Sequence, residues 1–460
     1  MASLPVFLSF PPSSLLRVPP EGADTSGFVP PPPAGSTPSA PPFDIPDHIY
    51  YAALDFRVPI TIATIYAVTA KLLNAYNKAN GKKPWAISKT FFFHVFVILH
   101  NVFLAVYSAW TWWGMFNTLR RTVVSPLGPT GVAGLVDSIC GINGPAGLGN
   151  AAFFDPKTKT WQSYAADASA VFGPDGRPSR FATGRLWNEG LAFYGWLFYL
   201  SKFYEVFDTL IILAKGKLSS TLQTYHHAGA MLCMWAGIRF MSVPIWIFVF
   251  FNSLIHAIMY TYYTATALHI RVPMFIKRSL TSMQITQFLV GGSLAMAHSF
   301  VHYTIPVIAG SKTDSASGAA ASAAAGSESG RLIAVNLRDD GFQGEYTSQD
   351  MPCITNNGAT VAVWLNVFYL APLTYLFVAF FIESYLRRSN AAASAQAAAR
   401  RTGGVDARRL SNVQLAEKAG WEAAKNIERE VYGENTEEAV VSEKSSKKAN
   451  GKGRVLRNRY

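Results

Sequence analysis

The stretch GLAFYGWLFYLSKFYEVFDTLIILA, residues 190–214, decides the fold class of this chain. As a helix it is long enough to cross the roughly 30 Å hydrocarbon core of a bilayer. Its apolar character is interrupted by Lys202, Glu205 and Asp208, which follow one another at three-residue spacing and share one helix face. Because ionisable side chains are costly to bury in hydrocarbon, that face cannot point at lipid. The stretch therefore predicts a membrane helix in a bundle with a polar interior.

The composition of the whole chain supports this class. Hydrophobic residues make up 50% of the 460 residues and charged residues 15%, against roughly 25% charged in soluble domains. This balance argues against a purely cytosolic enzyme, and the small number of cysteines argues against a disulfide-built scaffold or a cysteine-rich zinc module. Apolar runs of membrane length recur near residues 58–76, 91–116, 190–214, 218–238, 243–267, 277–304 and 360–382.

Each run should be a helix, because a backbone exposed to lipid must satisfy its hydrogen bonds internally. We therefore expect an all-α membrane protein of about seven transmembrane helices, with one span more or fewer left open, that form a bundle around a cytosol-open cavity. Cytosolic connections carry an excess of Lys and Arg, and residues 77–90 contain only basic charges. The long loops 117–187 and 305–358 should then be non-cytosolic, with the N-terminus on their side and the C-terminus in the cytosol.

Three regions follow from these assignments. Residues 1–47 carry most of the proline runs and predict a disordered leader, residues 48–386 form the transmembrane domain, and residues 387–460 form a basic cytosolic tail. Basic flanks are the usual signature of membrane topology, so we expect no nucleic-acid partner. The Ser-, Ala- and Gly-rich segment 311–330 predicts a flexible insertion, and residues 405–432 predict either a membrane-surface helix or a disordered tail.

Polar side chains inside the runs are candidates for function. They occur on four consecutive runs: Lys202, Glu205 and Asp208; Gln223, His226 and His227; Asn252, His256, Tyr260 and Tyr263; Gln284 and Gln287. At about 1.5 Å per residue, these groups reach one level in the cytosolic half of the membrane. Lys202 and Glu205 alone could be a buried pair that locks helix packing. The shared level favours a cavity with histidines and carboxylates at its floor, suited to acyl chemistry on a water-soluble donor with a lipid tail.

These motifs resemble, in order, the four signature boxes of the ELO family of fatty acid elongases. The boxes are Lys202-x-x-Glu205-x-x-Asp208-Thr209, the histidine box ending in His226-His227, Asn252-x-x-x-His256-x-x-Met259-Tyr260-x-Tyr262-Tyr263, and Thr281-x-x-Gln284-x-x-Gln287. The resemblance covers roughly residues 50–385. Gln223 departs from it, since the family usually has histidine there. An amide can donate and accept hydrogen bonds but cannot take a proton in acid–base chemistry.

The resemblance implies a very-long-chain 3-ketoacyl-CoA synthase of the fungal type in the endoplasmic reticulum membrane. It would condense a long-chain acyl-CoA with malonyl-CoA to 3-ketoacyl-CoA, CO₂ and CoA, with no metal or other cofactor. Its partners would be the bilayer, a ketoacyl reductase and other elongation-cycle enzymes, with a homodimer left open. His226 would be the nucleophile and His227 and His256 would bind or protonate reacting groups. Lys202, Glu205 and Asp208 would orient these histidines, and the substrates would be bound by Gln223, Asn252, Tyr260, Tyr263, Gln284 and Gln287.

Two other functions fit a polytopic chain with buried polar groups. A membrane di-iron desaturase or hydroxylase needs about eight nitrogen ligands, and this chain has nine histidines with one adjacent pair. A polytopic lipid transporter would fit the buried charges, but no internal repeat is evident. Cys140 and Cys353 fall in the two long loops on the same predicted side, where they could be a disulfide or two free thiols.

Overall fold

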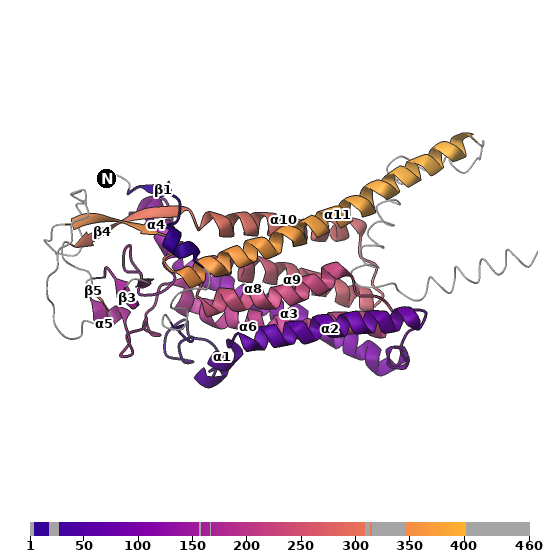
Figure 1. The fold of residues 1–460 in the computed structure, drawn as a ribbon, viewed down its shortest axis with the longest axis horizontal. Coiled ribbons are helices and arrows are strands. Elements are labelled where there is room, and N and C mark those ends of the chain that lie inside the picture. Colours follow the sequence, from indigo (N-terminus) through magenta and orange to yellow (C-terminus); the bar gives the residue numbers. More distant parts are fainter. Residues whose placement is uncertain are drawn as a thin grey trace, which may run out of the picture.

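The computed structural model describes residues 4–17, 27–155, 158–165, 167–308, 313–314 and 346–401. It is mostly helical, and its long helices run side by side along the longest axis of the molecule (Figure 1). The helical fold class predicted from the sequence is therefore confirmed. Most of segment 311–330, all of segment 405–432 and most of the predicted tail lie outside the described residues.

The bundle is built from the helices that follow the apolar runs. They are α2 (Arg57–Ala79), α3 (Phe91–Thr122), α6 (Ala192–Tyr204), α7 (Val206–Ala214), α8 (Thr221–Arg239), α9 (Ile245–Ala267), α10 (Met274–Ala297) and α11 (Asn357–Arg401). Short helices are η1 (Ser13–Leu16), α1 (Asp47–Ala53), η2 (Ala86–Lys89), α4 (Gly131–Cys140) and α5 (Ala168–Val171). Among the described residues, α2, α3, α9 and the Asn357–Ala379 part of α11 are long and apolar enough to cross a membrane. The count of seven spans stays a prediction.

Residues 190–214, predicted as a single membrane helix, are not one uninterrupted helix. The π-helical turn η3 (Trp187–Leu191) comes first, α6 follows it, and the helix breaks at Glu205 before α7. Gly190 has φ 157°, and a Cβ atom there would overlap the Thr118 hydroxyl of α3, so glycine permits this close helix contact. The break falls at Glu205 itself, and Asp208 lies one turn further along, inside α7.

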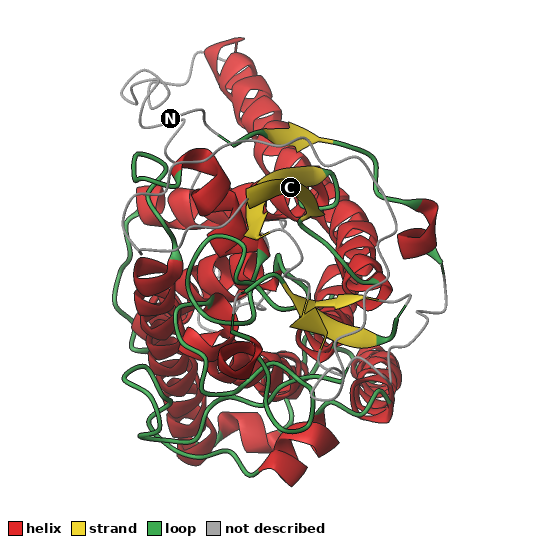
Figure 2. Cartoon of the chain, turned by 90° about the vertical axis from the view of Figure 1, so that its left-hand side faces the viewer, coloured by secondary structure: helices red, strands yellow, loops and turns green. Residues whose placement is uncertain are grey.

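Two small antiparallel sheets lie at one end of the bundle, together with the first described residues (Figures 1 and 2). One sheet has the order β1 (Val6–Leu8), β4 (Val301–Ile308), β6 (Tyr346–Pro352), and the other has the order β2 (Phe153–Asp155), β3 (Thr160–Ser163), β5 (Thr313–Asp314). In the first sheet His302 lies opposite both Phe7 and Pro352. We call these sheets and the loop 123–187 the cap. β2, β3, β5 and β6 fall in the two long predicted loops, and β1 falls in the predicted leader. β4 corrects the prediction of a helix over 277–304, because α10 ends at Ala297 and the chain is already a strand from Val301.

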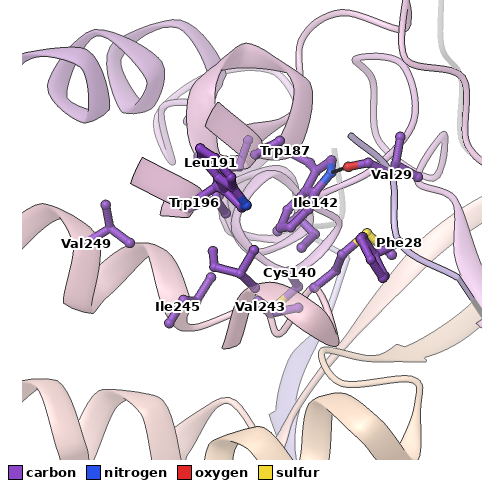
Figure 3. Packing of buried hydrophobic residues seen from close by; sticks show 14 of the residues in the cluster. Phe28, Val29, Cys140, Ile142, Trp187, Leu191, Trp196, Val243, Ile245 and Val249 are labelled. Carbon is purple, nitrogen blue, oxygen red and sulfur yellow. Dashed lines mark hydrogen bonds between the residues drawn. The ribbon is translucent and has the colours of Figure 1, made fainter. Parts of the chain in front are cut away.

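The segment predicted to be a disordered leader is ordered where the structure describes it. Phe28 is buried, and the carbonyl of Val29 accepts a hydrogen bond of 2.8 Å from the indole of Trp187 (Figure 3). The guanidinium of Arg180 donates to the carbonyl of Pro31 at 2.6 Å. Proline-rich backbone lacks N–H donors but keeps its carbonyl acceptors, so it can pack in extended form against a folded loop. The expectation of disorder does not hold for these residues.

Cys140 at the end of α4 and Cys353 after β6 form a disulfide with a Cα–Cα distance of 4.8 Å. The bond joins the two long connections, which agrees with their predicted place on one side of the membrane. A buried ion pair of 2.8 Å between Arg185 and Asp137 packs the same region. The cap is therefore a folded unit at one end of the bundle.

The basic connections gather at the other end. Asn77 near the end of α2 donates to the carbonyls of Leu213 and Lys217, at 2.8 and 2.9 Å. The backbone N–H of Trp85 in the first connection donates to the carbonyl of Ala214 at 2.9 Å. These contacts hold the first connection against the one between α7 and α8. The end away from the cap thus carries the lysine-rich loops on which the predicted orientation rests.

Candidate active site

Two adjoining cavities lie within the helix bundle. The apolar cavity is lined chiefly by hydrophobic side chains such as Phe198, Met234, Ile247 and Leu370. The polar cavity is lined by Asp208, Gln223, His227, His256, Tyr260 and Gln284, among others. Both are lined by His226, Asn252, Gln287 and Phe288. The imidazole of His226 therefore lies where the apolar cavity meets the polar one.

Lys202 and Glu205 form a buried ion pair at the cavity wall. The Lys202 ammonium donates to Glu205 Oε1 at 2.6 Å and lies 4.1 Å from the centre of the Phe198 ring. The same carboxylate oxygen accepts a hydrogen bond of 3.0 Å from Ser201 and lies 3.5 Å from His256 Nδ1. Lys202 also lines the apolar cavity. The pair is thus in contact with His256, a candidate catalytic histidine.

Asp208 is held from two other helices. Its carboxylate accepts a hydrogen bond of 2.6 Å from the Tyr260 hydroxyl of α9 and lies 2.8 Å from Nε2 of His100 on α3. His100 is buried. His100 is not among the site residues predicted from the sequence, although the high cost of burying an ionisable group in a membrane, which pointed to the other intramembrane histidines, applies to it as well. The three residues connect α3, α7 and α9 beside the polar cavity.

The two adjacent histidines have different partners. Nδ1 of His226 lies 2.9 Å from the hydroxyl of Tyr369 on α11. The His227 ring lies 5.4 Å from the His226 ring and makes an edge contact with Tyr66 of α2 at 6.0 Å. Tyr369 was missed from the sequence because tyrosines are common in this chain and no polar periodicity surrounds this one. The separate partners agree with the faces about 100° apart that adjacent helix positions occupy.

The remaining predicted binding residues divide into those that line a cavity and one that does not. Asn252 donates to the amide oxygen of Gln287 at 3.1 Å, which joins α9 to α10 between the two cavities. The Gln223 side-chain oxygen is buried in the wall of the polar cavity with no hydrogen-bond partner among the described residues. Gln284 lies 3.3 Å from the Met259 sulfur. Tyr263 packs against Tyr260 in a neighbouring hydrophobic cluster and lines neither cavity.

One alternative function, a membrane di-iron desaturase or hydroxylase, requires a metal centre. Within the residues that the structure describes, no group of three or more His, Cys, Asp or Glu side chains is placed to hold a metal ion. What the geometry offers instead is an imidazole between an apolar and a polar cavity, with an ammonium, a carboxylate and two further histidines around it. This arrangement suits covalent acyl transfer from a carrier to an imidazole nitrogen.

Comparison with known proteins adds an independent finding. A model of the family described as ELO: GNS1/SUR4 family matches residues 51–393. Fatty acid elongase 2 of Trypanosoma brucei brucei is 28% identical over 204 residues, which are 44% of this chain and 59% of that protein. Long chain fatty acid elongase 1 of Caenorhabditis elegans is 33% identical over 113 residues, 24% of this chain and 39% of that protein. Very long chain fatty acid elongase 3 of Homo sapiens is 35% identical over 111 residues, 24% of this chain and 40% of that protein. The chain therefore matches less than two thirds of the length of each of these relatives.

Proposed function

Because this chain belongs to the ELO family, we propose that it is a fatty acid elongase of the 3-oxoacyl-CoA synthase class. It condenses a long-chain acyl-CoA with malonyl-CoA to give a 3-ketoacyl-CoA, CO₂ and CoA. The observation that carries this proposal is the place of His226 at the junction of the apolar and polar cavities. A condensing enzyme needs such a junction, because a hydrocarbon chain and a charged malonyl group must meet at one reacting carbon.

Each cavity suits one part of the substrates. The apolar cavity takes the acyl chain, since burying apolar surface is favourable and Met234, Ile247 and Leu370 offer only hydrocarbon or thioether contacts. The polar cavity takes the malonyl thioester, whose carboxylate and carbonyl accept hydrogen bonds from the side-chain amides of Gln223 and Gln284, while the Tyr260 hydroxyl in the same wall donates to Asp208. Both substrates enter from the end with the basic connections, where the negatively charged CoA is attracted to lysines.

The chemistry is an acyl transfer in two stages. In the first stage, Nε2 of His226 attacks the thioester carbonyl carbon, the C–S bond breaks, and CoA leaves as a thiolate that takes a proton from water. In the second stage, malonyl-CoA loses CO₂ and the resulting enolate attacks the acyl carbon, which returns the electron pair to Nε2. His256 and His227 bind or protonate the oxygens that gain charge in these steps, while Lys202, Glu205 and Asp208 orient them. The two thioesters supply every bond, so the proposal includes no metal or other cofactor.

The membrane arrangement follows from the same proposal. The cap, with its disulfide, lies in the lumen of the endoplasmic reticulum, where an oxidising environment permits the bond. The basic connections and the C-terminal tail are then cytosolic. The 3-ketoacyl-CoA product must be reduced before another cycle, which makes a ketoacyl reductase and the other elongation-cycle enzymes the expected partners. Formation of a homodimer stays a prediction.

Malonyl-CoA-dependent chain growth tests the proposal. The full chain, purified and reconstituted in bilayers, is given a long-chain acyl-CoA and malonyl-CoA labelled in the two carbons retained after decarboxylation. We expect labelled 3-ketoacyl-CoA longer than the acyl substrate by one two-carbon unit. Movement of acyl-CoA across the bilayer without any incorporation of label would favour a lipid transporter and would reject the proposed reaction.

A further inference from the structure

Tyr369, on the last helix of the bundle, contacts His226. The hydroxyl of Tyr369 lies 2.9 Å from Nδ1 of His226 and 2.9 Å from the backbone carbonyl oxygen of the same residue. Tyr369 is buried and lines the apolar cavity. One phenol oxygen thus makes two contacts with one histidine, which fixes both the rotation of the imidazole and its distance from α11.

The two contacts bear on which imidazole nitrogen of His226 carries the proton. A carbonyl oxygen can only accept a hydrogen bond, and a phenol has a single proton to donate. When the Tyr369 hydroxyl donates to the His226 carbonyl, its oxygen is left to accept from Nδ1–H. A neutral imidazole with its proton on Nδ1 has a free electron pair on Nε2. We infer that Tyr369 is a positioning residue that holds His226 in this tautomer, with Nε2 as the nucleophile of the proposed elongase.

The surrounding contacts place the phenol ring for this purpose. A Cβ atom on Gly229, one turn after Tyr225, would overlap the ring carbons of Tyr369, so the absence of a side chain lets the ring approach α8. The Tyr225 ring stacks on Tyr369 with centroids 5.5 Å apart. Asn366, one turn earlier on α11, donates to the Cys233 carbonyl at 3.5 Å. These contacts set the register of α11 against α8 and hold the hydroxyl beside His226.

The same hydrogen bond supports the covalent step. Attack by Nε2 on the acyl-CoA carbonyl carbon forms a C–N bond, breaks the C–S bond, and gives an acyl-imidazolium and a CoA thiolate. The proton stays on Nδ1, which donates a hydrogen bond to the Tyr369 oxygen, and this bond stabilises the positive charge of the ring. When the enolate derived from malonyl-CoA takes the acyl group, the C–N electron pair returns to Nε2 and the ring is neutral again. Protons and charge therefore balance without any transfer to Tyr369.

The test is the first half-reaction in the reconstituted full chain. Acyl-CoA is added without malonyl-CoA, and the release of CoA is followed as a burst that reports acylation of His226. Tyr369→Phe keeps the ring and removes the hydroxyl, and we expect it to slow the burst at least about tenfold, the loss of one hydrogen bond to a reacting group. The KM for malonyl-CoA should stay unchanged. Tyr225→Phe is the matched control, because that hydroxyl bonds only weakly, at 3.3 Å, to the Tyr369 backbone carbonyl; its burst should equal that of wild type.

The outcomes separate this inference from the proposed function on which it rests. A Tyr369→Phe burst as fast as wild type would overturn the role of Tyr369 and leave the elongase proposal intact. Chain elongation by wild type without a burst would overturn the covalent step and this inference together, and absence of elongation would reject the proposed function itself. If Tyr369→Phe does not fold, Gly229→Ala displaces the ring while keeping the hydroxyl. A normal burst in that variant would likewise overturn the inference.

Discussion

Nε2 of His100 lies 2.8 Å from a carboxylate oxygen of Asp208, although the two residues are 108 positions apart in the chain. The contact joins α3 to α7 beside the polar cavity, and the Tyr260 hydroxyl reaches the other oxygen of the same carboxylate at 2.6 Å. Removing a carboxylate from water is costly unless hydrogen-bond donors replace the water, and here each oxygen of Asp208 has one. His100 is therefore part of what allows Asp208 to face the cavity.

Removing this donor should lower activity. His100→Ala leaves one oxygen of Asp208 without its partner, and we expect kcat for chain elongation to fall about tenfold or more. His100→Gln, whose amide can still donate, should recover part of the loss. His94→Gln, on the exposed surface of the same helix, is the control and should leave kcat unchanged. Equal kcat values for His100→Ala and wild type would show that Asp208 does not depend on His100.

Variants of the Lys202–Glu205 pair can distinguish a structural role of the pair from a catalytic one. Lys202→Met leaves a buried carboxylate without its cation, so thermal unfolding should begin at a lower temperature, with a loss of about 3–5 kcal/mol in stability. The double variant Lys202→Met, Glu205→Leu removes both charges and should recover most of this stability. It should nevertheless fail to elongate acyl chains, because His256 loses the carboxylate 3.5 Å from its Nδ1. Recovery of activity along with stability would mean that the pair only locks helix packing.

Substitution of Gln223 tests whether the polar cavity tolerates a histidine at this position. The Gln223 side-chain oxygen is buried in the cavity wall one turn before His227. Gln223→His restores the residue usual in the family, and we expect retained elongation with a changed distribution of product lengths, measured by chromatography of the acyl chains. Complete loss of activity would indicate that the site is built around a neutral amide, and Gln223 would no longer be a tolerated variant.

The disulfide can be tested by counting thiols. Denatured protein should react at one cysteine, Cys233, before reduction and at all three cysteines of the chain after it. Cys140→Ser should lower the free energy of unfolding by roughly 2–4 kcal/mol, because the bond closes a long loop in the unfolded chain. Labelling of three thiols before reduction would remove the bond. If Cys140 proves to be a free thiol, intact vesicles can be treated with a thiol reagent confined to the cytosolic side. Labelling of Cys140 by that reagent would contradict the proposed orientation.

The sequence allowed much of the site to be predicted, because burying polar groups in a membrane is costly enough to leave a clear pattern. Lys202, His226, Asn252 and Gln284 stand out against apolar neighbours on separate helices, and the structure brings them to the walls of two adjoining cavities. Helical rise alone predicts a common depth for these polar groups in the membrane. Among the described residues, α2, α3, α9 and the Asn357–Ala379 part of α11 were recognisable for the same reason, since their length and apolar character suit the thickness of a bilayer.

What the sequence could not predict depends on contacts between distant segments. Tyr369 has an ordinary aromatic neighbourhood, and only the packing of α11 on α8 brings its hydroxyl to His226. Tyr263 belongs to a family box yet faces a hydrophobic cluster, because its helix turns it away from both cavities. The cap was not predicted because its strands are short and because β1 lies in the proline-rich N-terminal segment. Neither feature gives a hydrophobic periodicity that could reveal the pairing of β1 with β4.

Acylation of His226 can be observed directly. After incubation with a labelled long-chain acyl-CoA and no malonyl-CoA, we expect label attached to the peptide that contains His226, and none in His226→Ala. That variant should also have lost condensation, while His227→Ala and His256→Ala should each be slower by at least about a hundredfold. Near-normal elongation by a folded His226→Ala protein would show that the residue at the junction of the two cavities is not the nucleophile.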